Sequence, residues 1–183
     1  VGTGEDVGGR HVGFGDGVYV SYDAGGSFQN MGLDDTEHIS KILVHAADSN
    51  VILVAAQGPL WKQGGQRGLY RSADGGKTWK QVLAAGPWTG CTDVVADPSD
   101  PQILYAALHQ RHRTVAALLN TGPESGIYKS VDGGESWSKL ERGLPAANKG
   151  KIALAVSPQK TNVVYASIEL PATKGGTWRS EDY

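Results

Sequence analysis

The sequence predicts an all-β protein assembled from repeated four-stranded antiparallel units. Three observations carry this prediction: a strand-and-turn pattern returns roughly every 50 residues along the chain of 183 residues, the apolar residues come in short runs, and turn-forming residues separate those runs. The chain also has 26 Gly, 5 Trp and 7 Tyr but only 2 Phe and 1 Met, a composition typical of strands joined by tight turns. A four-stranded antiparallel unit at this period is the signature of a β-propeller blade.

The clearest repeat is a short strand that ends in serine. It has the pattern Gly-x-aromatic-x-Ser, and its serines are Ser21, Ser72, Ser130 and Ser180, which lie 51, 58 and 50 residues apart. The first three serines open an octapeptide of the form Ser-x-Asp-x-Gly-x-Ser/Thr-aromatic, over residues 21–28, 72–79 and 130–137. The fourth serine opens the run Ser180-Glu181-Asp182, which matches the first three positions of the octapeptide. Three such octapeptides at equivalent places in a repeat are not a chance occurrence.

Pairs of apolar runs precede the second, third and fourth serines. The pairs are residues 42–44 with 51–54, 94–96 with 103–106, and 152–154 with 163–166, and turn-forming residues join the members of each pair. Links of this length suit hairpins rather than helical crossovers. One unit therefore contains four strands, called A (around Ile42), B (around Leu53), C (around Tyr70) and D (Trp79 to Leu83).

This strand pattern divides the chain into four units. We expect a partial blade of strands B, C and D over residues 1–32, complete blades over 39–84 and 91–141, and a partial blade of strands A, B and C over 150–183. Propellers close into rings of about 4 to 8 blades, because closure removes exposed sheet edges. We therefore expect an incomplete ring, which the remaining blades of a longer chain or further copies would complete; a small closed ring is the other alternative.

The octapeptides resemble Asp-boxes, the bacterial neuraminidase repeats of sialidases, xyloglucan-degrading glycoside hydrolases, photosystem assembly factors and the sortilin receptor domain. The resemblance covers essentially the whole chain. Residues 8–13, 37–42 and 110–115 are further similar to stretches of secreted bacterial proteins of sortilin-like or glycosyl-hydrolase-like type. The resemblance implies a propeller and a secreted or periplasmic location. It does not imply one activity, because Asp-boxes occur on propellers with unrelated functions.

The octapeptide aspartates are expected to be structural. Their carboxylates can accept hydrogen bonds from amides of their own turn, while the aromatic residue at the end fills the space between strands. A catalytic group is needed once, whereas this carboxylate recurs in every unit, so we exclude it from the site. The residues concerned are Asp23, Asp74 and Asp132, followed by Phe28, Trp79 and Trp137.

The topology also assigns the loops to two faces. Connections from A to B and from C to D lie on one face, and connections from B to C and from D to A lie on the other. The second face receives every long loop: residues 4–16, 30–38, 57–67, 84–91, 109–125, 143–150 and 169–175. Long loops on a rigid scaffold commonly carry binding or catalytic residues, so we expect the functional site there.

Polar and aromatic residues concentrate in these long loops. The expected ligand-binding residues are Arg10, His11, His38, Trp61, Trp88, His109, Arg111, His112 and Arg113, and the candidate catalytic carboxylates are Glu5, Asp6, Asp35 and Glu37. The leading hypothesis is a binding or scaffold segment that recognises a glycan or a polypeptide through this face. The plain alternative is that these residues are solvated or hold their loops in place.

The rival hypothesis is a sialidase-like or xyloglucanase-like glycoside hydrolase. It requires two carboxyl groups about 5 to 9.5 Å apart and aromatic platforms, for which Trp61 and Trp88 are candidates. The resemblance argues against it in part, because neither the arginine cluster nor the Tyr/Glu nucleophile pair of sialidases can be placed. Residues 5–9, Glu-Asp-Val-Gly-Gly, only partly match the Thr-Asp-Ile/Val-Gly-Gly run of xyloglucan-degrading relatives.

Other classes of function are disfavoured. The net charge is −2 with scattered basic residues, so we expect no nucleic-acid partner, and no apolar run approaches the roughly 20 residues of a membrane span. We expect no cofactor and no metal, although His109 and His112 with His11 and His38 offer a weaker nitrogen-rich alternative. Cys91 is expected to be a small buried residue, and residues 114–119 to allow a short helical turn within their loop.

Overall fold

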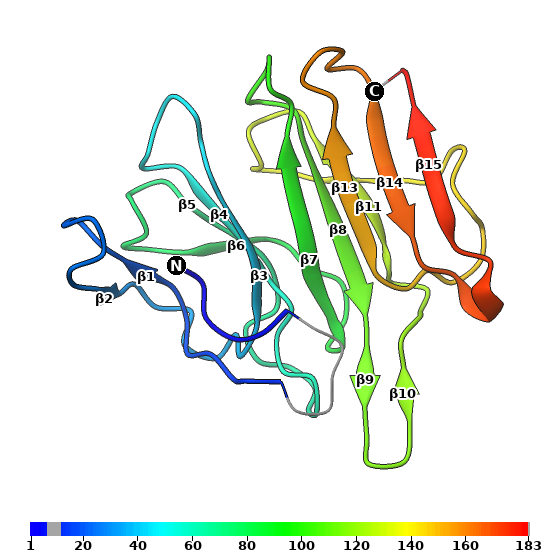
Figure 1. Ribbon diagram of the computed structural model, residues 1–183, viewed down its shortest axis with the longest axis horizontal. Coiled ribbons are helices and arrows are strands. Elements are labelled where there is room, and N and C mark those ends of the chain that lie inside the picture. Colours follow the sequence, from blue (N-terminus) through cyan, green and yellow to red (C-terminus); the bar gives the residue numbers. More distant parts are fainter. Residues whose placement is uncertain (7–11, 183) are drawn as a thin grey trace.

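The computed structural model describes residues 1–6 and 12–182, and their regular secondary structure is almost entirely β-strand (Figure 1). One short 3₁₀-helix, η1 (Pro171–Thr173), interrupts the strands. The described part contains no helix long and apolar enough to cross a bilayer. The strands are β1 (Tyr19–Val20), β2 (Gln29–Asn30), β3 (Ile39–Val44), β4 (Ile52–Ala56), β5 (Gly68–Ser72), β6 (Lys80–Leu83), β7 (Thr89–Ala96), β8 (Leu104–Gln110), β9 (His112–Arg113), β10 (Leu118–Leu119), β11 (Gly126–Ser130), β12 (Ser138–Leu140), β13 (Ile152–Val156), β14 (Val164–Ile168) and β15 (Gly176–Ser180).

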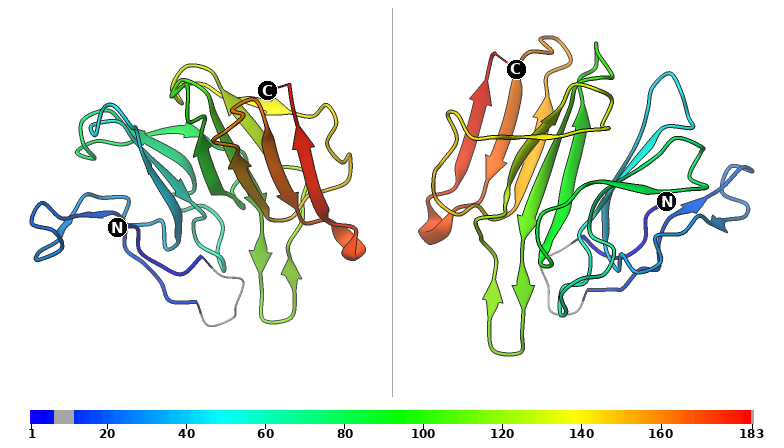
Figure 2. Two further views of the ribbon diagram at one scale, coloured as in Figure 1. Left: turned by 45° about the horizontal axis from the view of Figure 1, so that its top comes forward. Right: turned by 180° about the vertical axis from the view of Figure 1, so that it is seen from behind.

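The strands form a row of antiparallel sheets in chain order. The first four-stranded sheet has the order β3-β4-β5-β6 and the second has the order β7-β8-β11-β12. A three-stranded sheet, β13-β14-β15, follows, and the N-terminal unit pairs β1 with β2 and bridges Gly2 to Val18. Figure 2 shows these sheets one after another with their faces turned toward each other, as blades are. Meander pairing of this kind is what short hairpin links produce.

Three apolar clusters lie between consecutive sheets, and β4 contributes to two of them. Leu53 and Ala55 belong to the cluster between the two four-stranded sheets, whereas Val54 and Ala56 belong to the cluster shared with the N-terminal unit. Successive side chains of a strand point to opposite faces, so a strand that is apolar at every position needs a neighbouring sheet on both sides. All four side chains are buried.

The same alternation continues in the later sheets. In β8, Leu104, Ala106 and Leu108 face the first four-stranded sheet, while Tyr105 and Ala107 pack with the three-stranded sheet. In β14 only one face is covered: Val164 is buried, and its neighbour Tyr165 is 40% exposed.

Polar contacts join the A strands across the row. The Lys41 ammonium lies 2.8 Å from Oδ1 of Asp93, and the backbone amide of Leu154 donates to Oδ2 of the same carboxylate at 2.8 Å. One carboxylate on β7 therefore ties β3 and β13 together. Next to it, the Ser40 hydroxyl donates to the Cys91 carbonyl at 3.0 Å, where β-bulges interrupt both ladders.

The octapeptides form tight turns held by their own side chains. In the second, Oδ1 of Asp74 accepts from the Thr78 amide at 2.9 Å and Oδ2 accepts from the Thr78 hydroxyl at 2.6 Å. The Ser72 hydroxyl accepts from the Gly76 amide at 2.8 Å and donates to Asp74 at 2.7 Å. The other two octapeptides repeat this pattern at Asp23 and Asp132. These hydrogen bonds to the ionised form lower the pKa of both Asp23 and Asp132 to about 2.

The octapeptide turns pack against the A-to-B hairpins. The Gly75 amide donates to the Asn50 carbonyl at 3.0 Å, and the Gly133 amide donates to the Gln102 carbonyl at 3.0 Å. Both kinds of turn therefore lie on one face, here called the hairpin face. The long loops lie on the opposite face, here called the loop face.

Two expectations about local structure are wrong. Trp79 and Trp137 pack between sheets, but Phe28 is 54% exposed because no sheet lies beside it in the described chain. Residues 114–119 form no helical turn; instead β9 and β10 pair in a hairpin that extends from the loop face. The Thr114 side chain makes hydrogen bonds to the Ala117 backbone and closes the tight link between these strands.

We expect the apolar clusters to dominate stability. Leu53→Ala removes a side chain that is 2% exposed and should lower the free energy of unfolding by about 2–5 kcal/mol, through lost burial and the cavity left behind. Urea denaturation of the purified protein measures this loss. Val131→Ala is the control, since Val131 is 67% exposed. A loss for Leu53→Ala no larger than that of the control would contradict the packing.

The octapeptide carboxylates predict acid sensitivity. A pKa lowered from 3.8 to about 2 means that Asp132 stabilises the fold fully above about pH 4 and loses this effect as the pH falls toward 2. Asp132→Asn should therefore flatten the fall in unfolding free energy between these pH values. Urea titrations at several pH values test this, with the exposed Glu141→Gln as control. An unchanged acid profile in Asp132→Asn would refute it.

Candidate functional site

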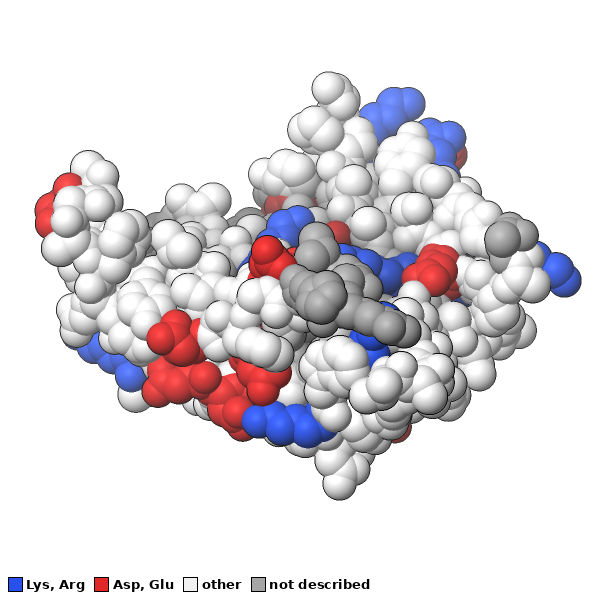
Figure 3. Space-filling view, turned by 60° about the horizontal axis from the view of Figure 1, so that its bottom comes forward, with Lys and Arg blue, Asp and Glu red and all other residues white. Residues whose placement is uncertain are grey.

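The long loops of neighbouring sheets are joined by backbone hydrogen bonds. The Arg111 amide donates to the Trp88 carbonyl at 3.0 Å, and the Arg113 amide donates to the Leu60 carbonyl at 3.2 Å. The Gly15 amide donates to the Glu37 carbonyl at 2.7 Å. Figure 3 looks toward this face, where acidic and basic side chains are intermixed. The loops thus form one connected surface across consecutive units.

Arg67 fixes the loop between β4 and β5 from the inside. It is only 5% exposed, and its guanidinium donates to three backbone carbonyls, those of Gly64 at 2.6 Å, Pro59 at 2.8 Å and Lys62 at 3.1 Å. Burial lowers the pKa of this guanidinium, with Glu37 opposing the effect. Because its guanidinium donates hydrogen bonds to carbonyl groups of its own loop, Arg67 has a structural role.

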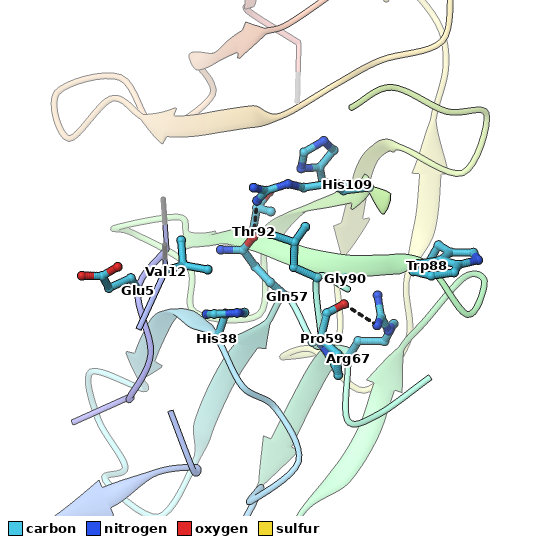
Figure 4. Close-up of a pocket in the computed structure, with 13 residues that line it drawn as sticks. Glu5, Val12, His38, Gln57, Pro59, Arg67, Trp88, Gly90, Thr92 and His109 are labelled. Atoms are coloured by element: carbon cyan, nitrogen blue, oxygen red, sulfur yellow. Dashed lines mark hydrogen bonds between the residues drawn. The ribbon is translucent and has the colours of Figure 1, made fainter. Parts of the chain in front are cut away.

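A pocket opens where the loops of the two four-stranded sheets meet (Figure 4). Residues from both sheets and from the N-terminal unit line it: Glu5, Val12, His38, Gln57, Gly58, Pro59, Leu60, Arg67, Trp88, Gly90, Thr92, His109 and Arg111. In Figure 4, His38, Gln57, Thr92 and His109 surround one part of the pocket, and Pro59, Arg67 and Trp88 lie at the other. A Cβ at Gly90 would overlap the Gln57 backbone, so glycine permits this close approach of β7 to the neighbouring sheet.

His109 presents a hydrogen-bond acceptor to this pocket. The side chain is 3% exposed, and its Nε2 lies 3.0 Å from the carbonyl oxygen of Asn120. A carbonyl only accepts, so Nε2 carries the hydrogen. Burial lowers the pKa of His109 to about 4, so the ring is neutral at pH 7 and its Nδ1 holds a free lone pair. Within the described residues, Nδ1 has no hydrogen-bond partner.

His38 and Arg111 supply donors beside that acceptor. His38 is 4% exposed, and neither ring nitrogen makes a hydrogen bond of good geometry within residues 1–6 and 12–182. Its pKa is lowered, mainly by burial, with Glu37 opposing and the charge of Arg111 adding to the effect. Nη1 of Arg111 lies 3.5 Å from Oε1 of Gln57, and its Nε and Nη2 are buried without a partner in the same part of the chain.

The four candidate carboxylates are engaged with other groups. Lys62 lies 3.6 Å from Asp35 and 3.2 Å from Glu37, so these two share one cation outside the pocket. Asp6 accepts from the Gln57 amide and lies 3.1 Å from the Lys151 ammonium. Oε2 of Glu5 accepts from the Gly13 amide at 2.9 Å. The structure thus assigns each a partner and only Glu5 a place in the pocket wall.

The two candidate aromatic platforms contact the β9–β10 hairpin, although Trp61 is still 38% exposed. The Trp88 ring stacks on His112 with centroids 3.7 Å apart, and the Arg113 guanidinium lies 5.9 Å from the Trp61 ring centre. The β9–β10 hairpin supplies both His112 and Arg113. Trp61 and Trp88 therefore support this hairpin.

The structure brings together part of the predicted set. Glu5, His38, Trp88, His109 and Arg111 line the pocket; Trp61, His112 and Arg113 lie beside it; Asp6 reaches it through Gln57; and Asp35 and Glu37 lie at Lys62. Arg10 and His11 lie outside the described residues. Sequence reasoning missed Gln57, Arg67 and Thr92. The only signal that could have pointed to two of them was their position, because Gln57 and Arg67 are the first and last residues of one predicted long loop.

The histidines of the weaker metal alternative contact different partners. His109 turns to the Asn120 carbonyl, whereas His112 stacks on Trp88. Among the residues that the structure describes, no three His, Cys, Asp or Glu side chains are grouped as metal ligands. Cys91 is fully buried, and burial raises the pKa of its thiol to about 12.

Comparisons with known proteins show structural similarity over nearly the whole chain. A crystal structure of an ancestral GH74 enzyme superimposes with a TM-score of 0.68 at 19% identity, over 93% of this chain and 21% of that one. The GH74 xyloglucanase from Xanthomonas campestris gives a TM-score of 0.67 at 18% identity, over 91% of this chain and 26% of that one. Niastella koreensis GH74 gives 0.57 at 16% identity, over 93% and 26%.

These similarities show the fold. The chain is an arc of a β-propeller. Its sheets are antiparallel, two of them four-stranded as predicted, and the arc spans about a fifth to a quarter of the length of those structures.

Sequence comparison adds one partial relative. The chain is 32% identical over 98 residues to vacuolar protein sorting/targeting protein 10 of Colletotrichum graminicola (strain M1.001 / M2 / FGSC 10212), a match that covers 54% of this chain and 5% of that protein. No protein-family model matches the chain. The predicted sortilin-like and glycosyl-hydrolase-like similarity is therefore supported at the level of the propeller.

The role of Arg67 can be tested directly. Lysine keeps the charge but cannot supply the fork of donors, so Arg67→Lys should lower the free energy of unfolding by about 1–3 kcal/mol and speed hydrogen exchange in residues 58–66. Urea denaturation and exchange mass spectrometry measure the two effects. Arg142→Lys is the matched control, because that side chain is 90% exposed. Equal behaviour of the two variants would refute the structural role.

Proposed function

We propose that this propeller arc binds a glycan across its loop face, with one sugar hydroxyl group at the mouth of the small pocket, of about 10 Å³, that His38, Gln57, His109 and Arg111 line. The observation that supports the proposal is that His38, His109 and Arg111, from two consecutive blades, line one pocket and each carry buried side-chain nitrogens without a hydrogen-bond partner among residues 1–6 and 12–182. Leaving such atoms unpaired costs free energy, about 1–3 kcal/mol for each neutral group, so a ligand or water that pairs with them is stabilised. A rigid scaffold with convergent polar groups is typical of a binding site.

The chemistry of the pocket favours a hydroxyl group. Arg111 can only donate, while the neutral His109 presents a lone pair at Nδ1 and can only accept there. A carboxylate satisfies Arg111 but repels the His109 lone pair. A sugar hydroxyl accepts from the one and donates to the other, and for this reason we favour a glycan over the carboxylate end of a polypeptide.

A glycoside hydrolase is the second candidate, favoured by the GH74 enzymes among the structural neighbours, one of which is a xyloglucanase. Such an enzyme would need two free carboxyl groups across the scissile bond. Asp6, Asp35 and Glu37 are paired with lysines, and Glu5 is held by the Gly13 amide. These contacts support binding without cleavage.

The proposal also covers the identity of the octapeptide repeats and the bounds of the blades. We propose that the octapeptide turns are Asp-boxes and that the blade bounds are 1–32, 39–84, 91–141 and 150–183. The exposed face of the three-stranded sheet, which includes Tyr165, would pack against a further blade of a longer chain or of another copy. We also propose a secreted or periplasmic location, which the resemblance to secreted bacterial propeller proteins implies.

Titration calorimetry with a xyloglucan oligosaccharide tests the site. Arg111→Met should weaken binding at least about 10-fold, the value of a charge-assisted hydrogen bond. Arg142→Met, at the highly exposed arginine, should leave affinity unchanged. Binding should persist from pH 7 to pH 5 and fall near pH 4, where protonation of His109 removes the acceptor.

Three results would contradict this proposal. The pocket would not be the binding site if the oligosaccharide gave no heat of binding, or if Arg111→Met bound it as tightly as the unsubstituted protein. Tighter binding below pH 4 would reverse the role of His109. Release of new reducing ends from the oligosaccharide would favour the hydrolase.

A further inference from the structure

A second cavity lies on the hairpin face, between the β3–β4 hairpin of the first four-stranded sheet and the β7–β8 hairpin of the second. Figure 1 shows both hairpins at the end of the sheets opposite to β9 and β10. The cavity has a volume of about 320 Å³, at the lower end of the range of about 300–1,000 Å³ that is usual for small-molecule sites. None of the residues that line it also lines the loop-face pocket.

Apolar side chains from the facing strands of the two sheets line the cavity. Leu43 on β3 pairs with Leu53 on β4, and Ala96 on β7 pairs with Leu104 on β8. Residues that pair across an antiparallel ladder lie on the same face of their sheet, and all four pack in the apolar cluster between the two sheets. The inner end of the cavity is therefore the outer margin of that cluster.

The polar side chains of the wall are engaged within their own turns. Nδ1 of His45 accepts from the amides of Ala47 and Asp48 at 3.2 and 3.1 Å. Oδ1 of Asp97 accepts from the Ser99 amide at 2.7 Å and from the Ser99 hydroxyl at 2.8 Å. Oδ2 of Asp97 is buried out of reach of a water-sized molecule, so this carboxylate offers no contact to a ligand in the cavity.

The backbone of the wall offers few donors. Pro98 and Pro101 line the cavity and carry no N–H group. The amides of His45, Asp97 and Gly133 donate to backbone carbonyls at 2.9, 2.9 and 3.0 Å. A polar ligand would therefore lose its hydrogen bonds to water and gain few in return.

The next pair of sheets shows a closed version of this junction. Between the second four-stranded sheet and the three-stranded sheet, the corresponding hairpins meet directly, because the Ser99 hydroxyl donates to the Thr161 hydroxyl at 3.1 Å. Between the two four-stranded sheets, the cavity separates the hairpins instead. The opening is therefore not a general consequence of the repeat.

We propose that this cavity binds an uncharged, largely hydrocarbon molecule of one or two rings, which lies against Leu43, Leu53 and Leu104. Burial of the apolar surface of the ligand between the two sheets supplies the free energy of binding. A peptide is a poorer occupant, because its backbone amides would find few free partners in this wall. The site is independent of the loop-face pocket, so either can bind its ligand without the other.

The test uses 1-methylnaphthalene as the neutral probe, with 1-naphthylmethylamine and 1-naphthoate as charged analogues of similar shape. Titration of the protein at pH 7, followed by amide NMR, should show that the hydrocarbon binds at least about 10-fold more tightly than either analogue, because a charge buried against this wall gains no partner. The shifts should be centred on residues 43–47 and 96–104. This comparison needs no variant, so it does not depend on how a substitution affects folding.

Two alanine variants locate the ligand. Ala96→Phe places a ring in the cavity, because the Ala96 side chain faces the first four-stranded sheet, and it should weaken binding of the hydrocarbon at least about 10-fold. Ala155→Phe is the matched control, since Ala155 also lies on an A strand, β13, but is exposed and does not line the cavity. It should bind the hydrocarbon normally.

Several results would overturn the proposal. Amine or carboxylate binding as tight as that of the hydrocarbon would show that the cavity does not select an uncharged ligand. Unchanged affinity in Ala96→Phe with a native amide spectrum, or shifts confined to the loop face, would place the hydrocarbon elsewhere. An absence of shifts up to the solubility limit of 1-methylnaphthalene would show that the cavity binds no such molecule.

Discussion

The structure depends on one constraint: its central strands are apolar on both faces. In β4, Leu53 and Val54 are neighbours in sequence, yet they are buried in different clusters on opposite sides of one sheet. Removing either neighbouring sheet would expose a complete apolar face, at roughly 25 cal/mol for each Å² returned to water. Stacking of sheets is therefore the condition under which each sheet is stable, and a row of blades is the result.

Stacking also creates the loop-face pocket. His38 precedes β3 in the first four-stranded sheet, and His109 lies on β8 in the second, so the two histidines meet only because these sheets pack face to face. Arg67 holds the loop between them, and Gly90 lets the two backbones approach. Among the residues that the structure describes, no side chain pairs with Nδ1 of His109 or Nε of Arg111, because close packing holds the neighbouring side chains in place.

The two faces of the arc differ in how they use carboxylates. On the hairpin face, octapeptide aspartates such as Asp74 use both carboxylate oxygens to accept hydrogen bonds within their own turn. Asp97, on the same face, also fixes its own turn, because its Oδ1 accepts from the Ser99 amide, the Ser99 hydroxyl and the Asp100 amide. On the loop face, lysines pair with Asp6 and Glu37. Among the described residues of that face, the buried side-chain atoms without a hydrogen-bond partner belong to Thr36, His38, His109, Arg111 and Arg113.

The sequence by itself determined most of the strands and their assembly into four-stranded antiparallel sheets of a propeller, because these follow from local patterns. Runs such as residues 103–106 predict a doubly buried strand, and an octapeptide closes on itself whatever surrounds it. Tertiary structure alone decided which loop residues meet and which remain free. Nothing local could show that Lys62 pairs with Asp35 and Glu37, or that Trp88 stacks on His112. Those outcomes depend on the angles and spacings between blades, which are set by side-chain packing across the whole arc.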